Sequence, residues 1–243
     1  NGIEGVMDLA AASGEDLAGV SDIVTDAMTA FGLSADGTTK IIKDGFTKEV
    51  SNASHFADVL AAASANSNTN VAMLGESFKY AAPVAGSLGY SVEDTAIALG
   101  LMASSGLKSS MAGSSLRTIL TNLAKPTDDI SDAMDYLGIS LQNGDGSMKS
   151  LMDIVTDLRG AFGQCKMPMD QFQENLAKLD EKYANGELTE KKYNEALADL
   201  TEKAYGAEGA LKAKYAATLA GKEGMSGLLS IVSAAPEDFD KLT

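Results

Sequence analysis

The sequence predicts an all-α protein: a compact multi-helix domain with one small β-hairpin near residues 139–149 and a projecting antiparallel helical hairpin. Apolar residues recur at i, i+3, i+4 and i+7 along most of the chain, which is the spacing of one buried helix face. Glycine or proline interrupts each periodic segment within about 20 residues. Of the 243 residues, 45% are hydrophobic, which is ample for a buried core.

The first strongly periodic helix begins near Asp16. We expect the hydroxyl of Ser13 to cap it, and Glu15 and Asp16 to complement the helix dipole. Gly32 is expected to end it in a left-handed conformation. The apolar positions of this helix share one face: Leu17, Val20, Ile23, Val24, Ala27, Met28 and Phe31.

Polar residues mark the starts of the helices that follow, because their side chains can accept a hydrogen bond from a first-turn N–H group. The expected caps are Ser54, Asn70, Ser91 and Thr127. Lys125 ends one helix because the residue before a proline disfavours the α region. These signals predict helices over residues 55–65, 71–85, 91–104, 109–123, 127–138 and 150–162.

The single strand signal lies between Ile139 and Met148. The run Asn143-Gly144-Asp145-Gly146 favours a turn with positive φ between two short extended segments. A calcium loop is the alternative for this run. Placing Gly146 at the invariant glycine puts Leu141 and Met152 at positions that require oxygen ligands, so the turn is favoured.

Charge density changes near residue 166. Residues 166–215 carry 8 basic and 10 acidic side chains, whereas 35 of the other 193 residues are charged. Two periodic helices, roughly 170–184 and 189–205, flank an Asn185-Gly186 turn. We therefore expect a charged helical hairpin, in which Leu176, Leu179 and Tyr183 face Tyr193, Leu197 and Leu200.

Outside that hairpin the helices are rich in alanine, glycine and serine, for example at residues 61–65, 81–86 and 102–106. Small residues let helix backbones approach closely, with less buried area per contact than leucine would give. Close packing within one chain explains this composition better than completion of the core by association.

Composition excludes several classes of function. The formal net charge of −15 argues against a nucleic-acid backbone or an anionic membrane surface as the main partner. Aromatic residues make up 6%, and tryptophan is absent. The longest apolar run, 95–107, is shorter than the roughly 20 residues that a bilayer requires. Residues 1–33 hold six acids and no lysine or arginine, so we expect these helices to face solvent or a basic partner.

No catalytic, cofactor-binding or metal-binding residues are predicted. Cys165 and His55 are the sole cysteine and histidine, too few for an internal disulfide or a Cys/His metal site. Cys165 is expected to be a buried or bystander thiol in a protein made in a reducing compartment. His55, near a helix start with Asp58 after it, is expected to lie at the surface or act as a cap. Methionines at helical spacing are expected in the core: Met73, Met102, Met111, Met134 and Met152.

Eight stretches of the chain form one ordered pattern: residues 7–18, 23–33, 54–69, 73–85, 106–108, 116–126, 137–141 and 221–229. In this order they resemble the core region of bacteriophage tail tape measure proteins, a minor tail protein family. The resemblance covers most of residues 1–165 and 216–243. Residues 36–51 and 166–215 depart from the pattern. We therefore divide the chain into a helical core region, 1–165, an inserted charged hairpin, 166–215, and C-terminal helices that return to the core, 216–243.

The resemblance implies a non-enzymatic module of the virion tail, assembled in the host bacterial cytoplasm. It implies a part in tail assembly, length determination and genome ejection, through contacts with tube proteins, tip proteins or assembly chaperones. Self-association and contact with the host membrane during ejection stay open, and we expect no direct contact with nucleic acid. A membrane-active module and a cell-wall hydrolase domain are the alternatives. Interrupted helices predict a compact region, because an extended ruler should show long uninterrupted heptads.

Overall fold

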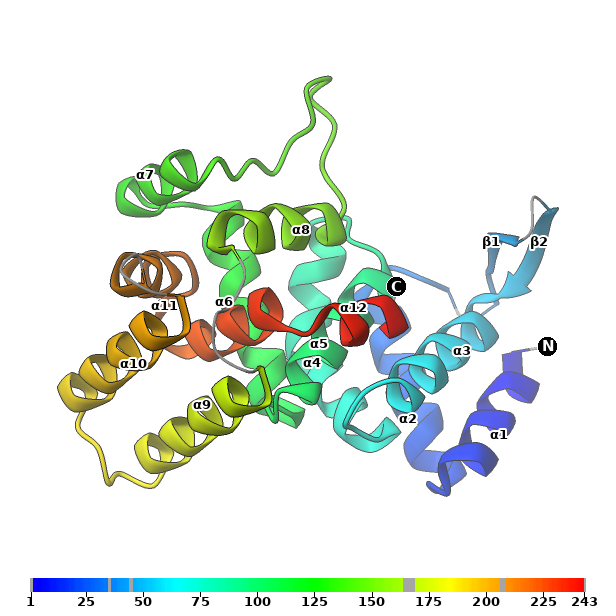
Figure 1. Cartoon of the computed structure of the whole chain (residues 1–243). Coiled ribbons are helices and arrows are strands. Elements are labelled where there is room, and N and C mark those ends of the chain that lie inside the picture. Colours follow the sequence, from blue (N-terminus) through cyan, green and yellow to red (C-terminus); the bar gives the residue numbers. More distant parts are fainter. Residues whose placement is uncertain (1, 35, 44–45, 164–168, 206–208, 243) are drawn as a thin grey trace.

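The computed structural model describes residues 2–34, 36–43, 46–163, 169–205 and 209–242 (Figure 1). This part of the chain contains twelve helices and one two-stranded antiparallel sheet, so the all-α prediction is confirmed. In chain order the elements are α1 Gly2–Ser13, α2 Leu17–Ala30, β1 Thr38–Lys43, β2 Phe46–Ser51, α3 Asn52–Ala65, α4 Val71–Ser87, α5 Val92–Ser104, α6 Ser109–Ala124, α7 Asp128–Leu137, α8 Leu151–Phe162, α9 Met169–Ala184, α10 Glu190–Tyr205, α11 Gly209–Ser233 and α12 Pro236–Leu242.

The helix starts follow the predicted caps in most places. The side chains of Asn70 and Ser91 accept hydrogen bonds from the backbone N–H groups of Met73, at 2.8 Å, and Asp94, at 3.0 Å. Thr127 caps α7, and Gly138 ends it at φ 68°. These outcomes confirm the local signals, because each needs groups only a few residues apart.

Two predicted caps are wrong. Asp16, and not Ser13, caps α2, because its carboxylate accepts a hydrogen bond from Gly19 N at 2.9 Å. Ser51, and not Ser54, caps α3 by accepting from Ser54 N at 3.2 Å. Helix α3 therefore begins about one turn earlier than expected, directly at the end of strand β2.

The centre of the molecule is a stack of α4, α6 and α11 (Figure 1). Glycines let these helices approach closely. The α carbon of Gly113 on α6 lies so near the carbonyl of Ser77 on α4 that a β carbon there would overlap it. At Gly227 on α11, an added β carbon would come within 2.7 Å of the Ser115 side chain. The close helix approach expected from the small residues is confirmed.

A kink divides α11 at Gly221, where φ is 65° and ψ is −178°. Side chains of α6 bond to backbone carbonyls on both sides of it. Asn122 donates to the Leu219 carbonyl at 3.1 Å, and Ser115 donates to the Glu223 carbonyl at 2.6 Å. A helix break leaves the carbonyls that precede it without their usual partners, and Asn122 satisfies one of these. Together the two bonds hold α11 against α6 on both sides of the break.

The sheet lies elsewhere than expected. Residues 139–149 form one isolated antiparallel bridge between Gln142 and Met148, closed by a bond from Asn143 N to the Ser147 carbonyl at 2.8 Å. The predicted hairpin there is thus reduced to a bridged turn. The two-stranded sheet is β1–β2, with Thr38 opposite Ser51, and it lies beside α3 at the edge of the molecule (Figure 1). No strand had been predicted in that segment.

Helices α9 and α10 form the expected antiparallel hairpin. Gly186 in the turn has φ 74°, and the rings of Tyr183 and Tyr193 stand 4.6 Å apart across it. Its inner face, including Leu176 and Leu197, is buried, and α10 packs along α11. The end that carries the turn points away from the other helices (Figure 1).

Candidate functional site: the cleft between hairpin and body

A cleft of about 590 Å³ lies between the α9–α10 hairpin and the remaining helices, which we call the body. Helices α6, α9, α10 and α11 all contribute to its walls. Its volume falls in the range typical of binding sites. Residues that line it include Leu107, Met111, Arg117, Asp180, Tyr183 and Ser226.

Three polar side chains on three helices meet in the cleft wall. Asp180 of α9 accepts hydrogen bonds on the same carboxylate oxygen from the hydroxyl of Tyr193 on α10, at 2.7 Å, and from Ser226 on α11, at 2.9 Å. The two hydroxyl oxygens are 3.2 Å apart. We call these residues the Asp180 cluster. It ties both helices of the hairpin to the body.

Burial sets the protonation of this cluster. It raises the pKa of Asp180, while the two hydroxyl donors act in the opposite direction. Burial and the neighbouring carboxylate raise the pKa of Tyr193. The phenol therefore stays neutral and can donate to Asp180 across the physiological pH range. This arrangement holds the hairpin in place and does not prepare Tyr193 as a base.

The mouth of the cleft combines apolar and cationic groups. Met111 is 52% exposed and Tyr183 is 39% exposed. Arg117 is exposed, and its guanidinium forms no hydrogen bond or ion pair within the described part of the chain. Lys222 of α11 lines the cleft and pairs with Glu190 of α10. Methionine, tyrosine and arginine are enriched where proteins contact each other, so the mouth suits contact with another chain.

The prediction that His55 lies at the surface or acts as a cap is wrong. Its side chain is 12% exposed, and Nε2 lies 2.7 Å from Oε1 of Glu93, which joins α3 to α5. The hydrogen bond to Glu93 raises the pKa of His55, although burial opposes it, and the same bond lowers the pKa of Glu93. The pair therefore connects two helices.

Asp94 of α5 also accepts hydrogen bonds from the start of another helix, α8. One of its carboxylate oxygens accepts from the backbone N–H groups of Leu151, at 3.0 Å, and Met152, at 3.4 Å, at the start of α8. Burial raises the pKa of Asp94. At the far end of α8, Arg159 donates to the carbonyls of Ile231 and Ala234, both at 2.9 Å. Helix α8 is thus bound at one end to α5 and at the other to the end of α11.

The remaining sequence candidates have mixed outcomes. Met102 and Met134 are buried as expected, but Met73 and Met111 are exposed, so the core prediction is wrong for those two. Cys165 lies outside the described residues. Within the described residues there is no group of three or more His, Cys, Asp or Glu side chains that could hold a metal. A separate search of the same residues finds no helix long and apolar enough to span a membrane.

Comparisons with known proteins find relatives of this chain. The model of a family described as phage-related minor tail proteins matches residues 1–179. The chain is 34% identical over 239 residues, 98% of its length, to the tape measure protein of Pneumococcus phage Dp-1, of which it covers 16%. It is 27% identical over 135 residues, 56% of its length, to the probable tape measure protein of Escherichia phage P2, of which it covers 17%.

No solved structure matches the chain. The chain spans about a sixth of the length of these two curated relatives. The match to the phage Dp-1 protein extends over nearly the whole chain, while the family match ends within α9. Because that family match covers most of the body, the chain belongs to the phage-related minor tail protein family, whose members are components of phage tails.

Proposed function

We propose that this chain is a non-enzymatic structural module of a tail tape measure protein. In this proposal it takes part in tail assembly, in setting tail length and in genome ejection, through contacts with other tail proteins. The family match over residues 1–179 carries the proposal. The relatives support it, because both are named as tape measure proteins.

The folded shape suggests which part of such a protein this is. A continuous α-helix rises about 1.5 Å per residue, so 243 residues in one helix would extend about 365 Å. Here the helices fold back on a common core, and the longest, α11, has 25 residues with a kink. We propose that the chain is a compact segment within a longer tape measure protein and not a part of its extended ruler.

The partners proposed for it are proteins of the tail tube or tip, or chaperones that act during assembly in the host cytoplasm. The negative net charge supports this choice over DNA, whose phosphates need an excess of lysine and arginine. The apolar and cationic mouth of the cleft between hairpin and body offers one surface for such contacts.

Deletion of this region from the parent phage gene tests the proposal, with tail lengths measured by electron microscopy. A compact segment predicts defective assembly or a change in tail length far below 365 Å. A shortening close to about 365 Å would show that the region is part of the ruler. Tails of normal number, length and infectivity after the deletion would contradict a role in the tail altogether.

X-ray scattering of the protein gives an independent measurement of its shape. A compact chain of 243 residues is expected to have a radius of gyration of about 18 Å. A straight helix of the same length would give about 105 Å. A value near the second would contradict the compact segment while leaving the family membership untouched.

A further inference from the structure

Helix α1 exposes an apolar ridge to solvent. Ile3 is 75% exposed, Met7 is 52% exposed, and Ala11 follows one turn later. Residues at i, i+4 and i+8 stack along one side of a helix. Glu4 and Asp8, both exposed, form a parallel row beside the ridge. The outer face of α1 therefore combines an apolar row and an acidic row.

The inner face of α1 is already used. Val6, Leu9 and Ala10 are buried, and α1 packs on α3 at the edge of the molecule (Figure 1). An added β carbon at Gly5 would come within 2.7 Å of the Ser54 α carbon, so the two backbones are in close contact. Rotation of α1 to bury Ile3 would break this contact. The ridge is thus held facing outward.

The acids of residues 1–33 form no ion pairs within the described part of the chain. Residues 1–33 contain six carboxylates and no lysine or arginine. The nine ion pairs of the described residues all lie elsewhere. Such helices are expected to face solvent or a basic partner, and the exposed apolar ridge favours the partner.

We propose that the outer face of α1 binds a basic amphipathic helix of another tail protein. Apolar residues of that helix, spaced three or four apart, would pack on Ile3 and Met7, since ridges of one helix fit the grooves of another. Its lysines or arginines would pair with Glu4 and Asp8, which gives the contact its specificity. This surface deepens the proposed function, on which it rests, by naming the chemistry of one partner.

Electrostatic complementarity favours a basic helix over the other possible partners of this face. A second copy of α1 would bring acidic rows against each other. Nucleic acid and anionic membranes carry the same sign of charge as Glu4 and Asp8, and phosphates make no use of an apolar ridge. A neutral apolar helix would leave both carboxylates unpaired beside the contact.

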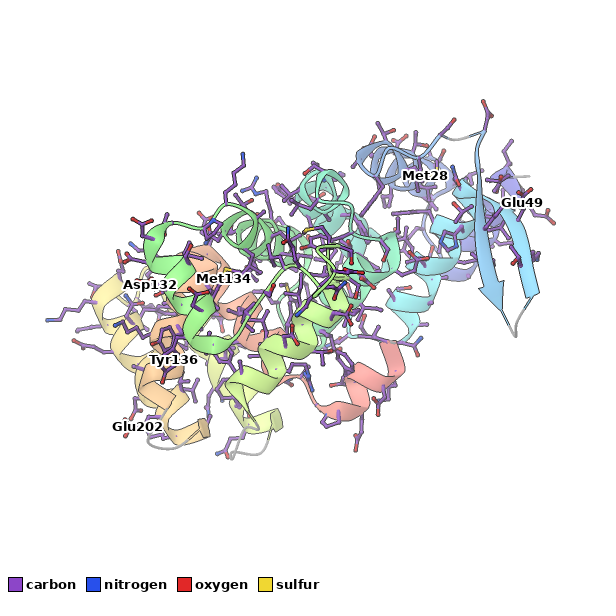
Figure 2. The ribbon with its side chains drawn as sticks, turned by 90° about the horizontal axis from the view of Figure 1, so that it is seen from above. Met28, Glu49, Asp132, Met134, Tyr136 and Glu202 are labelled. Atoms are coloured by element: carbon purple, nitrogen blue, oxygen red, sulfur yellow. The ribbon has the colours of Figure 1, made fainter. Side chains whose placement is uncertain are left out.

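Fluorescence anisotropy with a labelled 18-residue amphipathic peptide of leucine and lysine tests this surface. We expect the chain to bind the peptide, and the affinity to fall about tenfold or more in Ile3→Ser/Met7→Ser and in Glu4→Gln/Asp8→Asn, as at a contact centre. The matched controls are Asp132→Asn/Asp135→Asn and Tyr136→Ser/Met148→Ser. Asp132 and Tyr136 lie at the other end of the molecule from Met28 of α2 (Figure 2), and the controls should keep the wild-type affinity.

Three results would overturn the proposal: no binding by the wild-type chain, equal losses in test and control variants, or equal binding of a peptide with glutamate in place of lysine. Circular dichroism of each variant confirms that it is folded. Tails that require the region although the peptide does not bind would overturn this surface alone. Tails that form normally without the region would overturn the proposed function instead.

Discussion

The contact of α6 with α4 and the contact of the hairpin with α11 are made in different ways. At Gly113, backbones touch and the absence of a side chain sets the distance. Between hairpin and body, large side chains such as Phe172 and Leu197 are buried, and the Asp180 cluster supplies directed hydrogen bonds. The contact between α4 and α6 has no room for an added side-chain atom. The contact between the hairpin and α11 can lose side-chain atoms and still form. Substitutions of opposite kinds should therefore break them.

The largest effect is expected from Gly113→Val. Its branched side chain would overlap the Ser77 backbone, which cannot move without shifting α4. We expect the free energy of unfolding to fall by about 3–5 kcal/mol, or the chain not to fold. Denaturant titration measures this. Gly160→Ala is the control, since an added β carbon at this exposed position of α8 meets nothing within 4 Å, and it should stabilise the helix by about 0.5–1 kcal/mol.

Leu197→Ala tests the hairpin contact. The side chain is fully buried on α10, and its truncation should cost about 2–4 kcal/mol. Hydrogen exchange should show the loss in α9 and α10 first and leave the amides of α4 and α6 protected. Equal acceleration in all four helices would mean that hairpin and body unfold as one unit, which would remove the distinction drawn above.

Tyr193→Phe removes one donor to Asp180 and leaves the ring in place. We expect a loss of about 1–2 kcal/mol, because a buried carboxylate then lacks a hydrogen bond. Tyr183→Phe is the matched control, since its hydroxyl has no hydrogen bond within the described residues. Thermal melts of the two variants should separate clearly, and coincident melts would show that the Asp180 cluster contributes little.

The smallest effect is expected from the His55–Glu93 pair in the body, whose contribution to the free energy of unfolding depends on pH. The pKa of His55 is raised from 6.5 and that of Glu93 lowered from 4.5. The histidine contribution is full below its unfolded pKa and is lost as pH rises through the higher folded value. The glutamate contribution is full above its unfolded pKa and is lost as pH falls through the lower folded value. The pair thus stabilises most between pH 4.5 and 6.5, by under about 1 kcal/mol because Glu93 is half exposed.

His55→Gln should therefore flatten the stability profile above pH 6.5 in denaturant titrations at several pH values. Asp58→Asn, which removes a weaker charge near the same imidazole, should leave most of the slope. A profile unchanged by His55→Gln would show that the pair is not formed in solution.

Local signals in the sequence were enough for much of the fold. Asn70 and Ser91 cap helices through atoms three residues away, and Gly186 turns the hairpin through its own φ. Such features depend on neighbours in the chain, so a pattern can predict them. The expected division of the chain at residues 165 and 215 is a prediction of the same kind and awaits its own test.

The cleft was not predicted, because its groups are distant in sequence. Asp180 and Ser226 are 46 residues apart, and Asp94 reaches an N–H group 57 residues away. No pattern of residue spacing predicts a contact between residues so far apart in the sequence. Asp94 lies in the first turn of α5, where the helix dipole alone favours an acid, so the sequence carries no signal for its partner on α8. Strand β1 was missed for a related reason: Thr38–Lys43 is short, and its partner β2 decides its conformation.

The glycine and alanine contacts of the body also have a thermal consequence. The heat capacity change of unfolding grows with the apolar area that becomes exposed, and small side chains hide less of it than leucine or phenylalanine. For the body we expect a value per residue below the usual range of about 12–15 cal/mol/K. Its stability should then change only gently between cold and warm conditions, which differential scanning calorimetry can measure.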